Sequence, residues 1–291
     1  MTSTGEAMRI CRFNSDRIGV VNGGNVHDVT DCLNQLPTLH YPFPQEDQLI
    51  AHLDELLPAF AARAANAPGL DLAQVKLENP IANPSKVIGV PSNYKKHIEE
   101  AGRDPVIGQG RPRQTLKEAG LFLKANTALC GSGDPLVLHF PDRRTDHELE
   151  LVAVIGRKAK NITEAEALDH VAGYTIGLDM TLRGPEDRSL RKSIDTYAVV
   201  GPWLVTRDEI ADPDDLDMTL WVNDEKRQSS NTKHMIYNVA QQIAIASTFY
   251  TLLPGDIIMT GTPEGVGPVK AGEWMRAEIE AIGAMEIRAQ S

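Results

Sequence analysis

The chain has 291 residues, of which 42% are hydrophobic and 24% charged, and a formal net charge of −11 at pH 7. This acidic balance argues against a nucleic-acid partner, because binding to phosphates depends on lysine and arginine. No apolar run reaches the roughly 20 residues of a membrane helix, so no membrane partner is expected, and the N-terminal residues lack the apolar core of a signal peptide. The three cysteines, Cys11, Cys32 and Cys130, predict buried, reduced thiols in a cytoplasmic protein.

Residues 1–80 predict a small N-terminal domain. Three short strand-like runs, at 8–13, 17–21 and 25–30, are separated by asparagine and glycine. Residues 48–65 carry apolar side chains at helical spacing, which predicts an α-helix. The next residues, 66–85, are rich in proline and asparagine and indicate a linker. We therefore expect a domain boundary near residue 80 and a second domain over residues 81–291.

The second domain is predicted to be rich in strands. A buried strand is expected at 86–90, and a short helix should follow over 93–102. Further strand-like runs lie at 121–125, 135–140, 147–156, 173–180, 197–205, 218–228, 256–262 and 275–289, and one long helical pattern lies at 235–253. Many strands with few helices predict a β-rich α+β fold. Between these elements, residues 103–118 carry scattered glycine, proline and arginine, which predicts a mobile loop that acts as a lid.

Two acidic residues stand out in the apolar run HELELVAVIG at 147–156. On a strand, Glu148 and Glu150 point to the same face, with Cα atoms about 6.6 Å apart at a rise of ~3.3 Å per residue. Three arrangements relieve their repulsion: exposure at a sheet edge, protonation of one carboxylate, or a cation between them. Asp179 ends another strand-like run, and three such oxygen ligands suit Mg²⁺, Mn²⁺ or Ca²⁺ better than zinc.

Other polar residues have both an ordinary and a catalytic interpretation. His97 and Glu100 share one helix face, either as an imidazole base oriented by a carboxylate or as part of a solvated surface. Lys192 precedes an apolar strand, where it is a surface residue or a group that neutralises charge on an anionic substrate. The glycine-rich loop 261–267 lacks the ending of a phosphate loop, but its exposed amides and the Thr262 hydroxyl are suited to holding a carboxylate.

Seven short motifs, taken in order, resemble those of the fumarylacetoacetate hydrolase family. They are NYxxHxxE, FLK, ExEL, GYTxxxD, KSxDT, GPW and TGTPxGVG, and the resemblance runs from about Lys86 to Ile287. The resemblance implies a mixed β-roll catalytic domain behind a small N-terminal α/β domain, usually in a homodimer. It implies that a Mg²⁺ or similar ion bound by Glu148, Glu150 and Asp179 relieves the repulsion between the two glutamates.

The same resemblance implies roles for other side chains. His97 and Glu100 match the family's catalytic pair, and Lys192 matches its catalytic lysine. Arg183, Gln228 and Thr262 match positions that contact the substrate. The sequence departs from the family at Leu178 and Gly184, which replace polar residues beside the metal aspartate. The segment between Gly102 and Leu121 is also longer than usual, which points to a larger lid.

The resemblance also implies a class of reaction. A metal acting as a Lewis acid on a 2-oxo acid stabilises an enolate. The leading hypothesis is a divalent-metal-dependent hydrolase that cleaves a C–C bond in an acylpyruvate, such as fumarylpyruvate, in the catabolism of aromatic compounds. The alternative is an isomerase or decarboxylase that acts on a 2-hydroxy-diene-dioate or oxaloacetate through the same enolate. A binding protein without catalytic activity is the competing class, and the intact pair of His97 and Glu100 argues against it.

Overall fold

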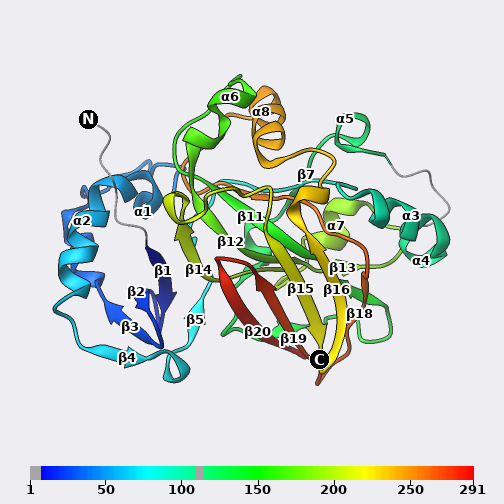
Figure 1. Cartoon of the computed structure of the whole chain (residues 1–291), viewed down its shortest axis with the longest axis horizontal. Helices are drawn as coiled ribbons and strands as arrows, with labels where there is room; N and C mark the ends of the chain where they lie inside the picture. The colour runs from blue at the N-terminus through cyan, green and yellow to red at the C-terminus, as the bar shows by residue number, and fades with distance from the viewer. Residues whose placement is uncertain (1–7, 109–113) are drawn as a thin grey trace.

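One large mixed β-sheet organises the fold (Figure 1). The computed structural model describes residues 8–108 and 114–291, and the sheet has 12 strands within these ranges. Its path runs through β4 (Gly69–Asp71), β3 (Asn25–Asp28), β2 (Arg17–Asn22), β1 (Arg9–Phe13), β14 (Ala198–Thr206), β12 (Val171–Asp179), β11 (Leu149–Ile155), β17 (Ile257–Met259), β6 (Val87–Gly89) and β7 (Phe122–Lys124). Off this path, β5 (Leu77–Glu78) pairs with β1 and β8 (Leu129–Cys130) pairs with β14.

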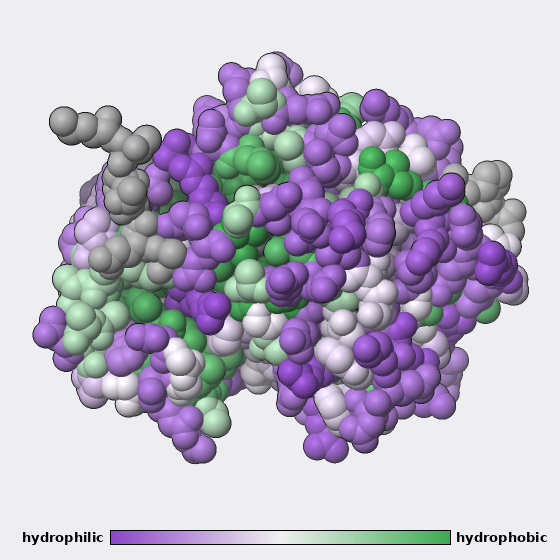
Figure 2. Space-filling view, viewed as in Figure 1, coloured by the Kyte–Doolittle hydropathy of each residue, from purple (hydrophilic) through white to green (hydrophobic). Residues whose placement is uncertain are grey.

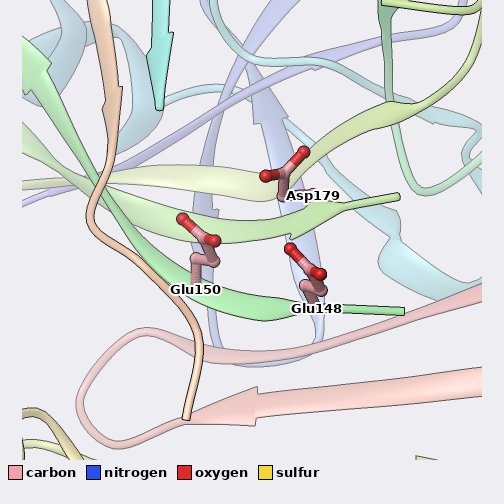
Figure 3. Close-up of side chains that lie close together, drawn as sticks. All are labelled: Glu148, Glu150 and Asp179. Atoms are coloured by element: carbon pink, nitrogen blue, oxygen red, sulfur yellow. The ribbon is translucent and has the colours of Figure 1, made fainter. Parts of the chain in front are cut away.

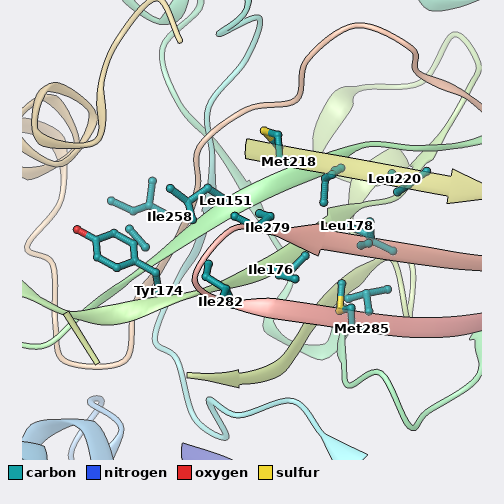
Figure 4. Packing of buried hydrophobic residues seen from close by; sticks show 14 of the residues in the cluster. Leu151, Tyr174, Ile176, Leu178, Met218, Leu220, Ile258, Ile279, Ile282 and Met285 are labelled. Carbon is teal, nitrogen blue, oxygen red and sulfur yellow. The ribbon is translucent and has the colours of Figure 1, made fainter. Parts of the chain in front are cut away.

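A second, five-stranded sheet packs against the large one. Its order is β16 (Glu225–Asn231), β15 (Asp217–Val222), β19 (Trp274–Ile279), β20 (Gly283–Gln290) and β9 (Leu136–Val137). Figure 4 shows Leu151, Ile176 and Leu178 of the large sheet facing Met218, Leu220, Ile279 and Met285 of the smaller one. A three-stranded sheet of β13 (Thr181–Leu182), β10 (Thr145–His147) and β18 (Gly267–Pro268) lies beside them.

Helices lie on both faces of the large sheet and at its ends. Helices α1 (Gln48–Ala51) and α2 (Leu53–Ala64) lie beside the N-terminal strands, whereas α3 (Lys95–Arg103), α4 (Pro105–Gly108) and α5 (Leu116–Ala119) lie at the opposite end of the molecule (Figure 1). The remaining helices are α6 (Glu164–Ala167), α7 (Arg188–Lys192) and α8 (Val239–Phe249). Short 3₁₀ segments are found at Thr30–Gln35, Leu72–Gln74, Asn126–Ala128, Leu168–His170, Arg207–Glu209 and Thr232–His234.

Strand β11 is buried on both faces, as its apolar sequence predicted. Leu151 and Ala153 belong to the core shared with the five-stranded sheet. Val152 and Val154 point the other way, into a second core that includes Phe60 of α2. Successive side chains of a strand alternate between faces, so a strand between two cores is apolar throughout. The predicted β-rich α+β fold is confirmed.

The N-terminal strands continue the large sheet. Strand β1 pairs with β14 in antiparallel register, with Arg9 opposite Val205. The predicted linker, residues 66–85, contains β4 and β5, and β5 pairs with β1 through Arg12 and Glu78. A chain of hydrogen-bonded strands therefore crosses the expected boundary, and the division near residue 80 stays a prediction.

The face of the molecule drawn in Figure 2 is mainly polar. Figure 2 shows that hydrophilic residues cover most of one face, with smaller hydrophobic areas on the side of the N-terminal strands. None of the helices in the described ranges is long and apolar enough to cross a membrane. The three cysteines are buried and free, as predicted.

Candidate active site

Three buried carboxylates meet where β11 and β12 run side by side. Glu150 lies on β11, opposite Gly177 of β12, and Glu148 immediately precedes β11. Asp179 ends β12. One carboxylate oxygen from each of the three acids lies within 4.8 Å of the others. Figure 3 shows the three side chains gathered on one side of these strands. The structure thus brings together the acids that the sequence singled out.

Glu148 is compensated by two cations. It accepts a hydrogen bond from Arg183 Nη2 at 2.8 Å and another from Lys192 Nζ at 2.8 Å. Burial by itself would raise the pKa of Glu148, but the ammonium of Lys192 and the guanidinium of Arg183 outweigh it and hold that pKa well below its usual range. Glu148 is therefore a carboxylate anchored in its charged form.

Glu150 has a different environment. Its one described hydrogen bond is accepted from the Gly261 amide at 2.8 Å. Burial, and secondly the nearby carboxylate of Asp179, raise its pKa well above the ordinary value. Glu148 and Glu150 are both buried, so exposure at a sheet edge is not what relieves their repulsion. Protonation of Glu150 or a cation beside it are the two arrangements that remain.

Two lysines converge on Asp179. Lys192 Nζ donates to Asp179 Oδ2 at 2.5 Å and to Thr181 Oγ1 at 2.7 Å. Lys124 Nζ donates to the other oxygen of Asp179 and to the Tyr197 carbonyl. Burial lowers the pKa of Lys124, against the attraction of Asp179. Lys124 belongs to the FLK motif, but the sequence analysis gave it no role, since an apolar strand end carries no signal of an ion pair.

The donor set fits a divalent cation. All three groups are carboxylates, and hard cations such as Mg²⁺ and Mn²⁺ prefer oxygen ligands. The lysines and Arg183 compensate Glu148 and Asp179 directly, while Glu150 has no described ion pair. Glu150 is therefore the carboxyl group whose charged form a bound cation would stabilise most.

His97 and Glu100 form a partly buried pair on α3. His97 Nδ1 lies 3.1 Å from Glu100 Oε2, and the His97 side chain is 8% exposed. The other Glu100 oxygen accepts from the Gly265 amide at 2.9 Å. A carboxylate only accepts hydrogen bonds, so Nδ1 donates to Glu100, and in the neutral imidazole Nε2 is then the acceptor. A solvated helix surface, the ordinary interpretation, is excluded for His97.

The loop at 261–267 contacts both the cluster of three carboxylates and the pair of His97 and Glu100. Its Gly261 amide binds Glu150, and its Gly265 amide binds Glu100. Both glycines have positive φ, of 98° and 91°, and a Cβ at Gly265 would lie 2.0 Å from the Arg227 carbonyl oxygen. The sequence predicted that amides of this loop hold a carboxylate. Two of them, at Gly261 and Gly265, bind carboxylates of the protein itself.

Gln228 supports this loop from behind. Its Nε2 donates to Thr262 Oγ1 at 2.8 Å and to the Pro263 carbonyl at 3.0 Å, and its Oε1 accepts from the Leu149 amide at 2.9 Å. Gln228 is fully buried and is absent from the described cavity lining. All of its described hydrogen bonds are made to the protein, and its contact with substrate stays a prediction.

The site residues line one cavity of about 730 Å³. The predicted members that line it are His97, Glu148, Glu150, Asp179, Arg183, Lys192 and Thr262. Glu100 stands behind His97. Ile107 and Gly108 of α4 and the more distant Gln114 also line the cavity. Part of the predicted lid, residues 109–113, lies outside the described residues, so the lid stays a prediction.

The two departures from the family pattern have distinct environments. Leu178 is fully buried in the core between the two sheets. Gly184 lies under Arg143, and a Cβ there would be 2.0 Å from Arg143 Nη2. This close approach lets Arg143 donate to the Arg183 carbonyl at 3.0 Å and bind both oxygens of Glu186 at 2.8 Å. Gly184 thus admits a guanidinium that a larger residue would displace.

The chain is similar to known proteins over almost its whole length. A profile of the family described as "Fumarylacetoacetate (FAA) hydrolase C-terminal" matches residues 86–290. A maleylpyruvate hydrolase of Aquipseudomonas alcaligenes is 52% identical over 286 residues, which cover 98% of this chain and 100% of the relative. The mitochondrial oxaloacetate tautomerase fahd2 of Xenopus laevis is 36% identical, with 96% of this chain and 89% of the relative covered.

A solved structure has the same architecture. It is the crystal structure of maleylpyruvate hydrolase from Sphingobium sp. SYK-6 in complex with manganese(II) ion and pyruvate. The TM-score is 0.82 at 39% sequence identity, and the match covers 97% of this chain and 99% of the other. The shared fold therefore includes the N-terminal strands as well as the profile-matched region.

Proposed function

The chain belongs to the fumarylacetoacetate hydrolase family, and on this premise we propose that it is a divalent-metal-dependent hydrolase of maleylpyruvate or a similar acylpyruvate. Fumarylpyruvate, the example expected from the sequence, is the trans isomer. The relatives favour maleylpyruvate, the cis isomer, because a full-length relative and a solved structure both carry that name. Such acids arise when aromatic rings are opened, which places the enzyme in aromatic catabolism.

One observation carries the proposal. A buried histidine, oriented by a carboxylate, lines the same cavity as three carboxylates that can hold a cation. A protein that only bound a 2-oxo acid would need the cation site but no base. The pairing of His97 with Glu100 therefore favours a reaction that begins with removal of a proton.

The proposed reaction uses water and returns its proton. His97 Nε2 takes a proton from water, and Glu100 stabilises the imidazolium that forms. The hydroxide attacks the carbonyl carbon two positions beyond the 2-oxo group, and the bond from that carbon to the intervening methylene carbon breaks. One fragment leaves as a carboxylic acid and the other as the enolate of pyruvate, which His97 reprotonates at carbon. When bound, a divalent cation supplies Lewis acidity at the 2-oxo acid end.

The remaining side chains have proposed supporting roles. Lys192 neutralises negative charge that develops on the leaving pyruvate. Arg183 and the Thr262 hydroxyl bind oxygens of the substrate at the cavity wall. Gln228 holds Thr262 in place through the hydrogen bond described above. Each of these groups is fixed by neighbours before substrate arrives, so little reorganisation is needed.

A second candidate is tautomerisation of oxaloacetate. The observation that favours it is the 36% identity to a tautomerase over nearly the full chain. Both reactions need a base beside a 2-oxo acid, and only hydrolysis releases pyruvate from an acylpyruvate. Pyruvate release separates the two candidates.

The test is a steady-state assay of the purified protein. Maleylpyruvate, fumarylpyruvate, acetylpyruvate and oxaloacetate are each supplied with Mn²⁺, with Mg²⁺ and with excess chelator. We expect pyruvate from the acylpyruvates, with either metal and not with chelator. Enol–keto exchange of oxaloacetate without any pyruvate from the acylpyruvates would reject the hydrolase and favour the tautomerase.

Three finer points are part of the proposal. Mg²⁺ or Mn²⁺ is the working cation, and metal titration of the stripped enzyme decides between them. The protein is a homodimer, which light scattering during size exclusion tests. It is located in the cytoplasm, with which its three buried free thiols agree.

A further inference from the structure

The cationic side chains of the cavity differ in whether they bind other groups of the protein. Four described lysine and arginine residues line it: Arg183, Arg188, Arg191 and Lys192. Three of them are buried and bonded to the protein. Arg183 and Lys192 bind carboxylates, and Arg191 donates to the carbonyls of Leu182 and Glu186. Arg188 is partly exposed, and no hydrogen bond or ion pair joins it to another described residue.

Arg188 is nevertheless held in a defined place. Its guanidinium carbon lies 5.4 Å from the centre of the Phe122 ring, and Lys192 Nζ lies 5.3 Å from the same centre. The two cations are four residues apart on α7, so they share one helix face. The ring is itself fixed, since a Cβ at Gly89 would lie 2.1 Å from Phe122 Cζ. The aromatic ring therefore places Arg188 beside the lysine of the reaction centre.

The segment that leads into α7 is also anchored. Arg143 binds both oxygens of Glu186 and the Arg183 carbonyl, as described above. Asp187 caps α7, because its side chain accepts from the Ser189 amide and hydroxyl at 2.8 Å. Glu186 and Asp187 are the two acids of the cavity lining nearest in sequence to Arg188, and both accept hydrogen bonds from other donors.

The exposure of the lining residues distinguishes the floor of the cavity from its entrance. The carboxylates, Lys192 and Thr262 are buried and form its floor, whereas Phe122 and Arg188 are partly exposed and stand nearer the entrance. A substrate whose 2-oxo acid end lies on the floor directs its other end toward Arg188. Arginine matches a carboxylate with two parallel hydrogen bonds. The Arg188 guanidinium attracts the neighbouring Asp187 electrostatically, but no acid among the described residues forms a hydrogen bond with it, so it can form both bonds with a substrate carboxylate.

We propose that Arg188, stacked on Phe122, receives the carboxylate at the far end of the substrate and so selects acylpyruvates that are dioates. The inference rests on the proposed function, because it assumes that the 2-oxo acid end binds at the floor. It names a specificity-determining residue that the sequence motifs do not contain.

The test compares matched substrates in matched variants. Maleylpyruvate carries the far carboxylate and acetylpyruvate lacks it. Arg188→Ala should lower kcat/KM for maleylpyruvate by about 10- to 100-fold, the usual effect of losing a hydrogen bond between charged groups. The value for acetylpyruvate should change less than about 3-fold, since this substrate has no carboxylate at its far end for Arg188 to bind. Arg188→Lys should recover part of the loss, because lysine keeps the charge but not the paired geometry.

Arg276→Ala is the control. Arg276 also lies over an aromatic ring, 5.5 Å from the centre of Trp221, but it is not in the described cavity lining. It should leave both substrates unaffected. Equal losses on both substrates in Arg188→Ala would mean that Arg188 shapes the site in general, and no loss on either would mean that it is a surface residue. Either result overturns the inference.

A binding measurement separates this inference from the proposed function. 2-Oxoadipate and 2-oxohexanoate have the 2-oxo acid end but no second carbonyl to attack, and only the first has a far carboxylate. Calorimetry with Mn²⁺ should show tighter binding of 2-oxoadipate to the parent protein, and Arg188→Ala should abolish that preference. A parent protein that cleaves no acylpyruvate yet shows this preference would reject the hydrolase and keep the Arg188 site. Equal affinities in the parent protein would overturn the site.

Discussion

Replacing Glu150 by glutamine should leave the metal-free protein at least as stable as the parent. The ligand oxygens of Glu150 and Asp179 lie within 4.8 Å of each other. Two unit charges at that separation repel by about 3 kcal/mol at an effective dielectric constant of 20. Glutamine removes this repulsion but also loses attraction to Lys192 and weakens the hydrogen bond from Gly261. We expect a net gain between zero and about 2 kcal/mol.

The same substitution should remove the stabilisation by metal. A ligand at 100 times its Kd stabilises the folded state by about 2.7 kcal/mol. At ~2–4 °C per kcal/mol, the melting temperature of the parent should rise by about 5–10 °C with Mn²⁺. Glu150→Gln should show a small fraction of that rise. Thermal unfolding with and without Mn²⁺, after treatment with chelator, measures both effects.

Glu278→Gln is the matched control, because Glu278 pairs with Arg276 on β19 away from the cavity. It should respond to Mn²⁺ as the parent does. The account of the acidic cluster fails if metal-free Glu150→Gln melts well below the metal-free parent. It fails also if the variant keeps the full rise with Mn²⁺.

Two further substitutions test the support of the site and of the N-terminal strands. Gln228→Leu should cost about 1–3 kcal/mol, because the buried Leu149 amide and Thr262 hydroxyl lose their partner; denaturant unfolding measures this, and an unchanged midpoint would contradict the supporting role. Glu78→Gln should cost about 1 kcal/mol at pH 7. Burial by itself would raise the pKa of Glu78. The hydrogen bonds from Arg12 and from the amides of Ser15 and Asp16 outweigh this effect and lower that pKa below 4.5. Stability from a lowered carboxyl pKa is present above the unfolded value and lost as the pH falls through the folded one. The difference between parent and variant should therefore shrink below about pH 4.5, and a difference that stays constant to pH 2.5 would show that charge is not its source.

Local sequence predicted most of the elements that form the site. The apolar run of β11 between two cores, the short helix with His97 and the turn-rich loop after β17 all follow from residue patterns over a few positions. The convergence of Glu148, Glu150 and Asp179 came from the resemblance, because it depends on β11 and β12 pairing in one register.

Features set by distant contacts were not predicted. The pairing of β1 with β14 joins residues almost 200 positions apart, and no local pattern reports it. The burial of His97 was also invisible, because its neighbours in sequence are charged while Ile107 and Val266 pack against the same helix at Ala101. The close approach of Arg143 to Gly184 also depends on a distant contact. A glycine in the sequence indicates that another group can lie close to the backbone there, but not which group does.

The central claim is that His97, oriented by Glu100, activates water for C–C cleavage. The most direct test follows ¹⁸O from labelled water into the maleate released from maleylpyruvate, in the parent and in His97→Ala at equal metal occupancy. We expect one ¹⁸O in each new maleate from the parent, and a rate lower by about 10²- to 10⁴-fold in His97→Ala. Labelled maleate formed by His97→Ala at the parent's rate would contradict it.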